Sequence, residues 1–152
     1  MRRPALLLFL LVAATGCAGE PEAAPTGLPT GTAVIETDGG EVRVKVEIAE
    51  TLETRSKGLM HRESLPEDAG MVFLHDEPST SGFWMKNTLI PLSVAFWGPD
   101  GHISEIVDME PCRKDPCPIY GQGISWVGAM EVNQGFFEEV GVAPGDVVRL
   151  ER

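Results

Sequence analysis

The chain has 152 residues, of which 23 are acidic and 12 are lysine or arginine, so its formal net charge at pH 7 is −11. A surface this acidic repels phosphate backbones and anionic lipid head groups, so nucleic acid is excluded as an expected partner. The length suits one domain with one hydrophobic core and is too short for two.

The start of the chain predicts export and lipid attachment. Arg2 and Arg3 precede an apolar stretch over residues 5–14. A membrane-spanning helix needs about 20 apolar residues, so this stretch is typical of a secretory signal and not of a permanent span. Small residues directly before Cys17 are typical of a bacterial lipoprotein signal, in which the cysteine becomes the lipidated N-terminus. Cleavage at an ordinary signal-peptide site, with Cys17 unmodified, is the alternative.

These features divide the chain into three regions: a signal peptide (1–16), a lipidated cysteine with a flexible tether (17–31) and a folded β domain (32–152). The tether is rich in proline, glycine and small residues and has no pattern of a buried face. Loss of the signal removes two arginines and no acids, which takes the net charge from −11 to −13. We expect the mature protein to be anchored to a bacterial membrane through its lipid, facing the periplasm or the cell surface.

The folded region has the pattern of a mainly β domain. Charged and β-branched residues alternate over 41–48, the period of a strand with one buried face. A helix is predicted over 51–60 with Thr51 as its N-cap, and another over 134–140. The other predicted strands are 32–37, 71–74, 82–86, 89–97, 102–109, 125–132 and 147–150. Short strands with two brief helices predict a single-domain β-sandwich or barrel.

Cys112 and Cys117 form an even pair once Cys17 is assigned to lipid. They lie in a proline-rich segment, and outside the cytoplasm such a pair predicts a disulfide that fixes the shape of one loop. A redox pair and half of a metal site are the alternatives. The redox motif has two intervening residues and this segment has four, which disfavours the first of these.

Polar residues interrupt two apolar segments. Glu131 and Asn133 face the same side of a strand, where a carboxylate either pairs with a base or lies in a cleft. Lys86 and Asn87 follow an aromatic pair, and on an extended segment 82–88 the Lys86 side chain would share a face with Trp84. The lysine would then cover the indole ring or close one side of a pocket, unless it is solvated with Asn87 in a turn.

Two hypotheses follow for these polar residues. In the first, Glu131 forms a structural ion pair with Arg55 or Arg62. In the second, a polar pocket for a small ligand is formed by Arg62, Lys86, Asn87, Glu131 and Asn133. No catalytic residue, cofactor or metal site is assigned, because no phosphate loop, zinc motif or nucleophile elbow is present in the sequence.

The methionines and histidines permit a copper hypothesis, since thioethers and imidazoles suit Cu(I). No Met-x-Met or His-x-Met cluster is present, however, and each methionine is placed where core packing would use one. The residues concerned are Met60, Met71, Met85, Met109, Met130, His61 and His75.

The folded region resembles the domain-of-unknown-function 192 family. The motifs that carry the resemblance are Arg55–Arg62, Gly70–Phe73, Phe83–Leu92, Asp100-Gly101, the Cys112/Cys117 segment, Glu131–Phe136 and Gly145-Asp146. The similarity covers roughly Ala33 to Leu150. The resemblance implies a small, often exported, mainly β domain of jelly-roll kind. It implies no activity and no catalytic residues, because none is established for the family.

We therefore expect a binding or accessory module at the cell envelope. Its expected partners are the membrane, through the lipid anchor, and a small ligand or an envelope protein. An envelope enzyme that uses Arg62, Lys86 and Glu131 is one alternative, and an extracytoplasmic copper carrier is the other.

Overall fold

The computed structural model describes residues 27–152, so the predicted signal peptide and Cys17 lie outside the described residues. The first strand begins within the segment expected to be tether, because Thr30 and Gly31 already pair with Glu47 and Val46. None of the helices in the described part is long and apolar enough to cross a bilayer. The strands are β1 (Thr30–Thr37), β2 (Gly40–Ala49), β3 (Ala69–Ser79), β4 (Phe83–Trp84), β5 (Leu92–Trp97), β6 (Ile103–Met109), β7 (Ile119–Tyr120), β8 (Trp126–Asn133) and β9 (Val147–Glu151).

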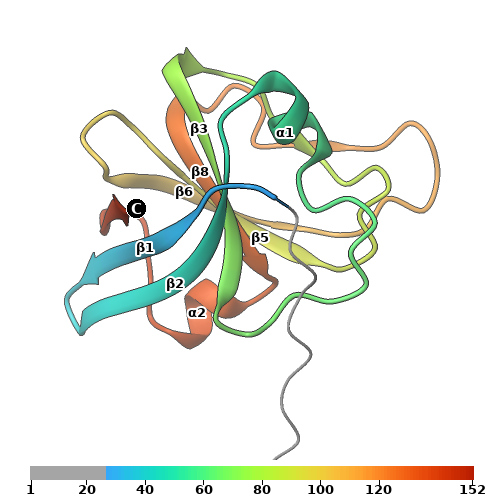
Figure 1. Ribbon diagram of the computed structural model, residues 1–152. Coiled ribbons are helices and arrows are strands. Elements are labelled where there is room, and N and C mark those ends of the chain that lie inside the picture. Colours follow the sequence, from blue (N-terminus) through green and yellow to red (C-terminus); the bar gives the residue numbers. More distant parts are fainter. Residues whose placement is uncertain (1–26) are drawn as a thin grey trace, which may run out of the picture.

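The main sheet has seven strands in the order β6-β5-β8-β3-β2-β1-β9, and β4 and β7 form a separate pair (Figure 1). All neighbours in the main sheet are antiparallel except β2 and β3, which are parallel. A parallel pair needs a long connection, and the helix-containing segment 50–68 supplies it. The predicted mainly β, single-domain fold with two short helices is confirmed; the parallel pair was not predicted.

The two edges of the sheet approach each other at one end. His102, just before β6, forms an isolated bridge with Val147 of β9. Backbone hydrogen bonds from Ile103 N to Asp146 O and from Val148 N to Gly101 O join the same segments. Elsewhere the two edge strands, β6 and β9, are not paired with each other. The described sheet is therefore strongly curved but is not a closed barrel.

Apolar side chains form two cores on opposite faces of the sheet. The first core contains residues from all seven strands and from the second helix: Ala33, Ile35, Val44, Val46, Ile48, Val72, Ala95, Trp97, Ile103, Met130, Val132, Phe137, Val142 and Val148. The second core contains Ala49, Leu59, Leu65, Met71, Phe73, Met85, Leu92, Val94, Phe96, Met109, Trp126 and Ala129. Strand β5 is buried on both faces, which explains why its sequence is a nearly continuous apolar run.

Helix α1 (Leu52–Lys57) is defined by its caps. Thr51 and Thr54 form a capping box at its start, and Gly58 ends it with φ 47°, a conformation that favours glycine. The helix is therefore shorter than predicted, and Leu59 turns into the second core. Helix α2 (Phe136–Glu139) instead places Phe137 in the first core, so the two helices cover different faces of the sheet (Figure 1).

The predicted strand 82–86 is correct only at Phe83 and Trp84. The chain turns directly afterwards, where Thr88 N donates to Met85 O at 3.2 Å and Asn87 adopts φ 58°. The predicted alternation of faces therefore fails beyond residue 86: Thr88 is buried and Asn87 is exposed. The partner of β4 is β7, a two-residue strand that the sequence did not predict.

Candidate functional site

A cavity of about 330 Å³ lies on the second-core face of the sheet, between α1, β3, the segment 81–88 and β8. Leu52 and Trp84 are 77% and 50% exposed and lie at its solvent side, whereas Glu131 of β8 is 4% exposed and lies at its buried side. Apolar atoms form most of the lining surface, and the apolar side chains in it are Leu52, Leu59, Met60, Phe73, Phe83, Trp84 and Trp126. The polar residues of the lining are Arg55, Ser56, Lys57, His75, Ser81, Thr88 and Glu131.

The aromatic wall is centred on Phe83. Its ring centroid lies 4.9 Å from that of Phe73 and 5.5 Å from that of Trp126. The indole Nε1 of Trp126 donates to Ser81 O at 2.8 Å, and the His75 ring lies edge-on to the same indole with centroids 4.7 Å apart. Edge-to-face rings with a satisfied indole N–H form a preorganised apolar surface.

Glu131 is the buried acid of this cavity. It lies opposite Met71 of β3 and Val94 of β5, both fully buried, so its own sheet neighbours offer no charge. Within residues 27–152, no group hydrogen-bonds or ion-pairs with its carboxyl. Within the same residues, every side-chain oxygen that is completely inaccessible has a hydrogen-bond partner. The Glu131 carboxyl has no partner, so its oxygens retain some accessible surface, and they border the cavity that Glu131 lines. Burial raises the pKa of Glu131 to about 8, which leaves the side chain mostly a neutral acid at pH 7.

The cationic residues of the lining lie on α1 and leave Glu131 unpaired. Arg55 donates through Nη1 to the backbone oxygens of Glu50 and, at 2.8 Å, of Leu74, which fastens α1 to β3. Burial, with a smaller effect of the Arg55 charge, lowers the pKa of His75, so this imidazole is neutral at pH 7. Burial is the cause of the raised pKa of Glu131, and within residues 27–152 neither Arg55 nor Lys57 forms a hydrogen bond or an ion pair with its carboxyl.

The five residues predicted to form a polar pocket do not line one cavity. Arg62 pairs with Glu47 in a half-buried ion pair, so the predicted pairing of Arg62 or Arg55 with Glu131 is wrong. Asn133 Nδ2 donates to Leu65 O at 2.9 Å and to Pro66 O at 3.2 Å, which holds the loop before β3. Of the five residues, Glu131 alone lines the aromatic cavity.

Lys86 and Asn87 lie outside the cavity. The Lys86 ammonium lies 5.8 Å from the centroid of the Trp84 ring and 3.5 Å from Asp115 Oδ2, as expected of a lysine that covers an indole. The Asn87 carbonyl accepts a hydrogen bond from His61 N at 2.8 Å, so Asn87 is a turn residue. Both residues stabilise the segment that carries Phe83 and Trp84.

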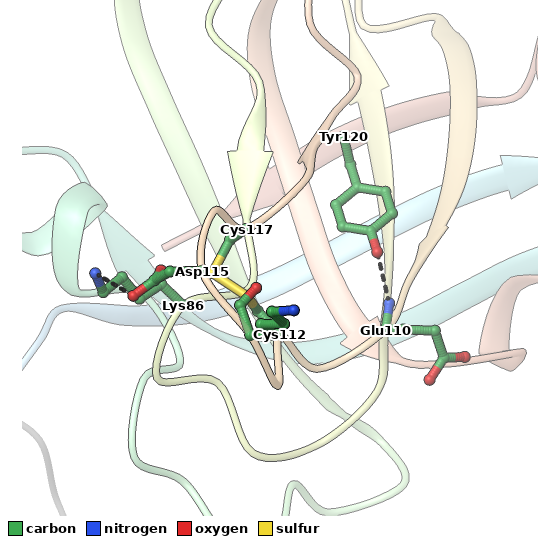
Figure 2. The surroundings of a disulfide bond; sticks show 7 residues. Lys86, Glu110, Cys112, Asp115, Cys117 and Tyr120 are labelled. Atoms are coloured by element: carbon green, nitrogen blue, oxygen red, sulfur yellow. Dashed lines mark hydrogen bonds and ion pairs between the residues drawn. A yellow bond between two sulfur atoms is a disulfide. The ribbon is translucent and has the colours of Figure 1, made fainter.

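The predicted disulfide between Cys112 and Cys117 is present, with 5.5 Å between the Cα atoms. Figure 2 shows it between the Lys86–Asp115 contact and the hydrogen bond from Glu110 N to the Tyr120 hydroxyl. Cys112 N also donates to Met85 O at 3.3 Å, so the loop supports the back of the aromatic wall.

The same loop contains the one group of potential metal ligands within the described residues, Cys112, Asp115 and Cys117. Their ligand atoms lie within 4.8 Å of one another, but the two sulfurs are bonded to each other and are not thiolates. The methionines of the copper hypothesis are largely core residues, because Met71, Met85, Met109 and Met130 have no exposed surface. Their burial is explained by packing.

Sequence reasoning identified Glu131 but missed the aromatic wall. Trp126 and Glu131 are an odd number of residues apart on β8, so strict alternation predicts opposite faces. The pairing of β3 with β8 shifts register between Leu74 and Ser79, opposite Trp126, and this irregularity turns the indole toward the second core. No pattern in the sequence marks such a shift.

The fold and site define a small domain with one curved mixed sheet and an aromatic cavity that contains a buried acid. The chain belongs to the domain-of-unknown-function 192 family, DUF192, described as "Uncharacterized ACR", whose model matches residues 33–150. This agrees with the resemblance carried by the sequence motifs.

Two solved structures are similar to the chain over most of its length. One, from Novosphingobium aromaticivorans, is a protein of unknown function with 30% identity and a TM-score of 0.74, and the match covers 87% of this chain and 94% of that one. The other, from Sinorhizobium meliloti 1021, is described as a "putative transcription regulator", with 29% identity, a TM-score of 0.72 and coverage of 81% and 95%. No curated protein matches the chain.

Proposed function

We propose that this chain is an exported, lipid-anchored binding module of the bacterial cell envelope, which holds a small and largely apolar ligand in its aromatic cavity. Anchoring is supported by the basic and apolar start of the chain, by Cys17 and by the proline-rich segment that follows it. Binding is supported by the cavity, whose volume of about 330 Å³ falls within the range of roughly 300–1,000 Å³ usual for ligand pockets.

The observation that carries the binding proposal is the unpartnered Glu131 carboxyl at the buried side of an aromatic cavity. An apolar pocket with few polar groups is the usual form of a small-molecule site, and those polar groups fix the orientation of the ligand. A polar group without a partner in an apolar core costs stability, so a purely structural side chain at this position would be apolar.

A nucleic-acid function is not proposed. The net charge of −11 opposes contact with phosphate, and the words used for the Sinorhizobium meliloti protein apply to that protein. Envelope binding suits the acidity better, because a charged surface keeps a tethered domain soluble and apart from anionic head groups.

A thermal-shift screen of the full-length protein in detergent, with a library of small aromatic and alicyclic compounds, tests the binding proposal. A ligand at 100 times its Kd stabilises the folded state by about 2.7 kcal/mol, which is readily measured as a rise in Tm. Ser56 is an exposed residue of α1 that lines the cavity, so Ser56→Trp should block the mouth and abolish the rise.

Glu53→Trp is the matched control for the screen, because Glu53 is exposed on the same helix and does not line the cavity. The control should keep the full rise in Tm. Equal rises for both variants would place the ligand elsewhere and contradict the proposal.

A further inference from the structure

Within residues 27–152, no side chain or backbone group forms a hydrogen bond or an ion pair with the Glu131 carboxyl. Its side chain is 4% exposed, and the two residues opposite it in the sheet, Met71 and Val94, are apolar. The titratable groups that share the cavity within residues 27–152 are Arg55, Lys57 and His75. None of these contributes to the raised pKa of Glu131, for which burial is the cause.

The aromatic rings that share the cavity with the carboxyl, and the acidity of the chain, favour a cation over an anionic group. Aromatic faces attract ammonium groups, and the described structure contains one such contact in the Lys86 ammonium, 5.8 Å from the centroid of the Trp84 ring. Trp84 also lines the cavity, together with Phe73, Phe83 and Trp126. In addition, the net charge of −11 raises the local concentration of cations and lowers that of anions.

Arg55 and Lys57 place positive charge on the α1 side of the cavity and Glu131 places an acid on the opposite, buried side. Nη1 of Arg55 is already engaged by two backbone oxygens, so the guanidinium is held at α1. A ligand cation would therefore be repelled from α1 and attracted to β8.

We infer that the ligand is an organic amine, whose protonated nitrogen ion-pairs with the Glu131 carboxylate while its apolar part packs against Phe83 and Trp126. This inference rests on the binding function proposed above and specifies the chemical class of its ligand. Binding transfers the Glu131 proton to solvent, since the acid must ionise to pair with an amine that arrives protonated. The bond broken is the carboxyl O–H, and no other covalent change occurs.

The test compares three probes of similar shape on the full-length protein in detergent by isothermal titration calorimetry: phenethylamine, phenethyl alcohol and phenylacetate. At pH 7 the amine should bind at least about tenfold more tightly than the alcohol, a difference of about 1.4 kcal/mol, and phenylacetate should bind most weakly. Titrations in buffers of different ionisation enthalpy should show release of most of one proton per amine bound, because the Glu131 pKa of about 8 lies above the working pH.

Glu131→Gln keeps the shape and removes the charge, so it should abolish both the preference for the amine and the proton release. Glu139→Gln is the matched control, because it removes one acid from an exposed position on α2, outside the cavity. Should Glu131→Gln fail to fold, the wild-type protein still provides a test: its affinity for the amine should rise between pH 6 and pH 8.

The outcomes separate this inference from the proposed function. Alcohol binding as tight as amine binding, an amine preference that persists in Glu131→Gln, or an affinity that falls as the pH rises would overturn the inference and leave the binding function standing. Failure of all three probes, together with a flat thermal-shift screen, would overturn both.

Discussion

Glu131 is the residue at which the fold departs from ordinary core composition. A carboxyl that is 4% exposed and lacks a protein partner remains in the structure by staying protonated. Its pKa of about 8 in the folded state, against an ordinary 4.5, means that the folded chain binds a proton which the unfolded chain releases over this interval. The cavity therefore makes the stability of the domain depend on pH.

The sign of this dependence follows from proton linkage. Below pH 4.5 Glu131 is protonated in both the folded and the unfolded chain, so its ionisation does not affect the free energy of unfolding. Between pH 4.5 and about 8 Glu131 ionises in the unfolded chain only, which stabilises the unfolded state relative to the folded one. The free energy of unfolding should fall by up to about 1.4 kcal/mol per pH unit until the pH reaches the folded pKa. Glu131→Gln should remove this contribution.

Urea denaturation of both proteins at pH 5, 6, 7 and 8 checks the prediction. The difference in unfolding free energy between Glu131→Gln and wild type should increase steadily in favour of the variant. Parallel curves would show that Glu131 has the same pKa in both states.

At the scale of elements, α1 forms one wall of the cavity and depends on its caps. The helix spans only Leu52–Lys57, too short to be stable alone, so the capping box at Thr51 and the Arg55 contacts to neighbouring carbonyls hold it in place. Thr51→Ala should lower the free energy of unfolding by about 0.5–2 kcal/mol. Thr51→Ser keeps the side-chain acceptor and should lose much less, and an equal loss in both variants would mean that the cap contributes nothing.

The disulfide loop supports the opposite wall. A closed loop this short restricts the unfolded chain only modestly, so replacing Cys112 and Cys117 together by serine should cost roughly 2 kcal/mol, near the low end for disulfides. Because Cys112 N donates to Met85 O beside the aromatic wall, the variant should also bind the cavity ligand less tightly. Denaturation and calorimetry on the same preparation measure both effects, and unchanged ligand affinity would show that the loop does not support the wall.

The predictability of these elements depends on whether their determinants are local. The two strands of the β1–β2 hairpin and the Thr51 cap were predicted because alternation and capping act over a few residues. The β4–β7 pair, the parallel pairing of β2 with β3 and the shift opposite Trp126 were not, because each depends on strands distant in sequence. Glu131 was found because an acid inside an apolar strand is itself a local anomaly.

At the scale of the whole molecule, the domain places its cavity in the second core, to which connecting segments contribute together with the strands. Leu59, Leu65 and Met85 contribute to this core from the segments that follow α1 and β4. Such segments pack on a sheet that already has a core on its other face, so they can leave space for a ligand without loss of the fold.

Attachment of the domain to the membrane is expected at Cys17. If Cys17 is the lipidated N-terminus, cells expressing the wild-type protein and supplied with labelled palmitate should yield a labelled protein in the membrane fraction, because more than one acyl chain gives stable anchoring. Cys17→Ser removes the acceptor sulfur and should abolish the label. The matched control is the double serine variant of Cys112 and Cys117, which should remain labelled because these sulfurs form the disulfide. Absence of label from the wild type would instead indicate cleavage at an ordinary signal-peptide site and a domain released from the membrane. Label in Cys17→Ser would show that a residue other than Cys17 carries the acyl chain.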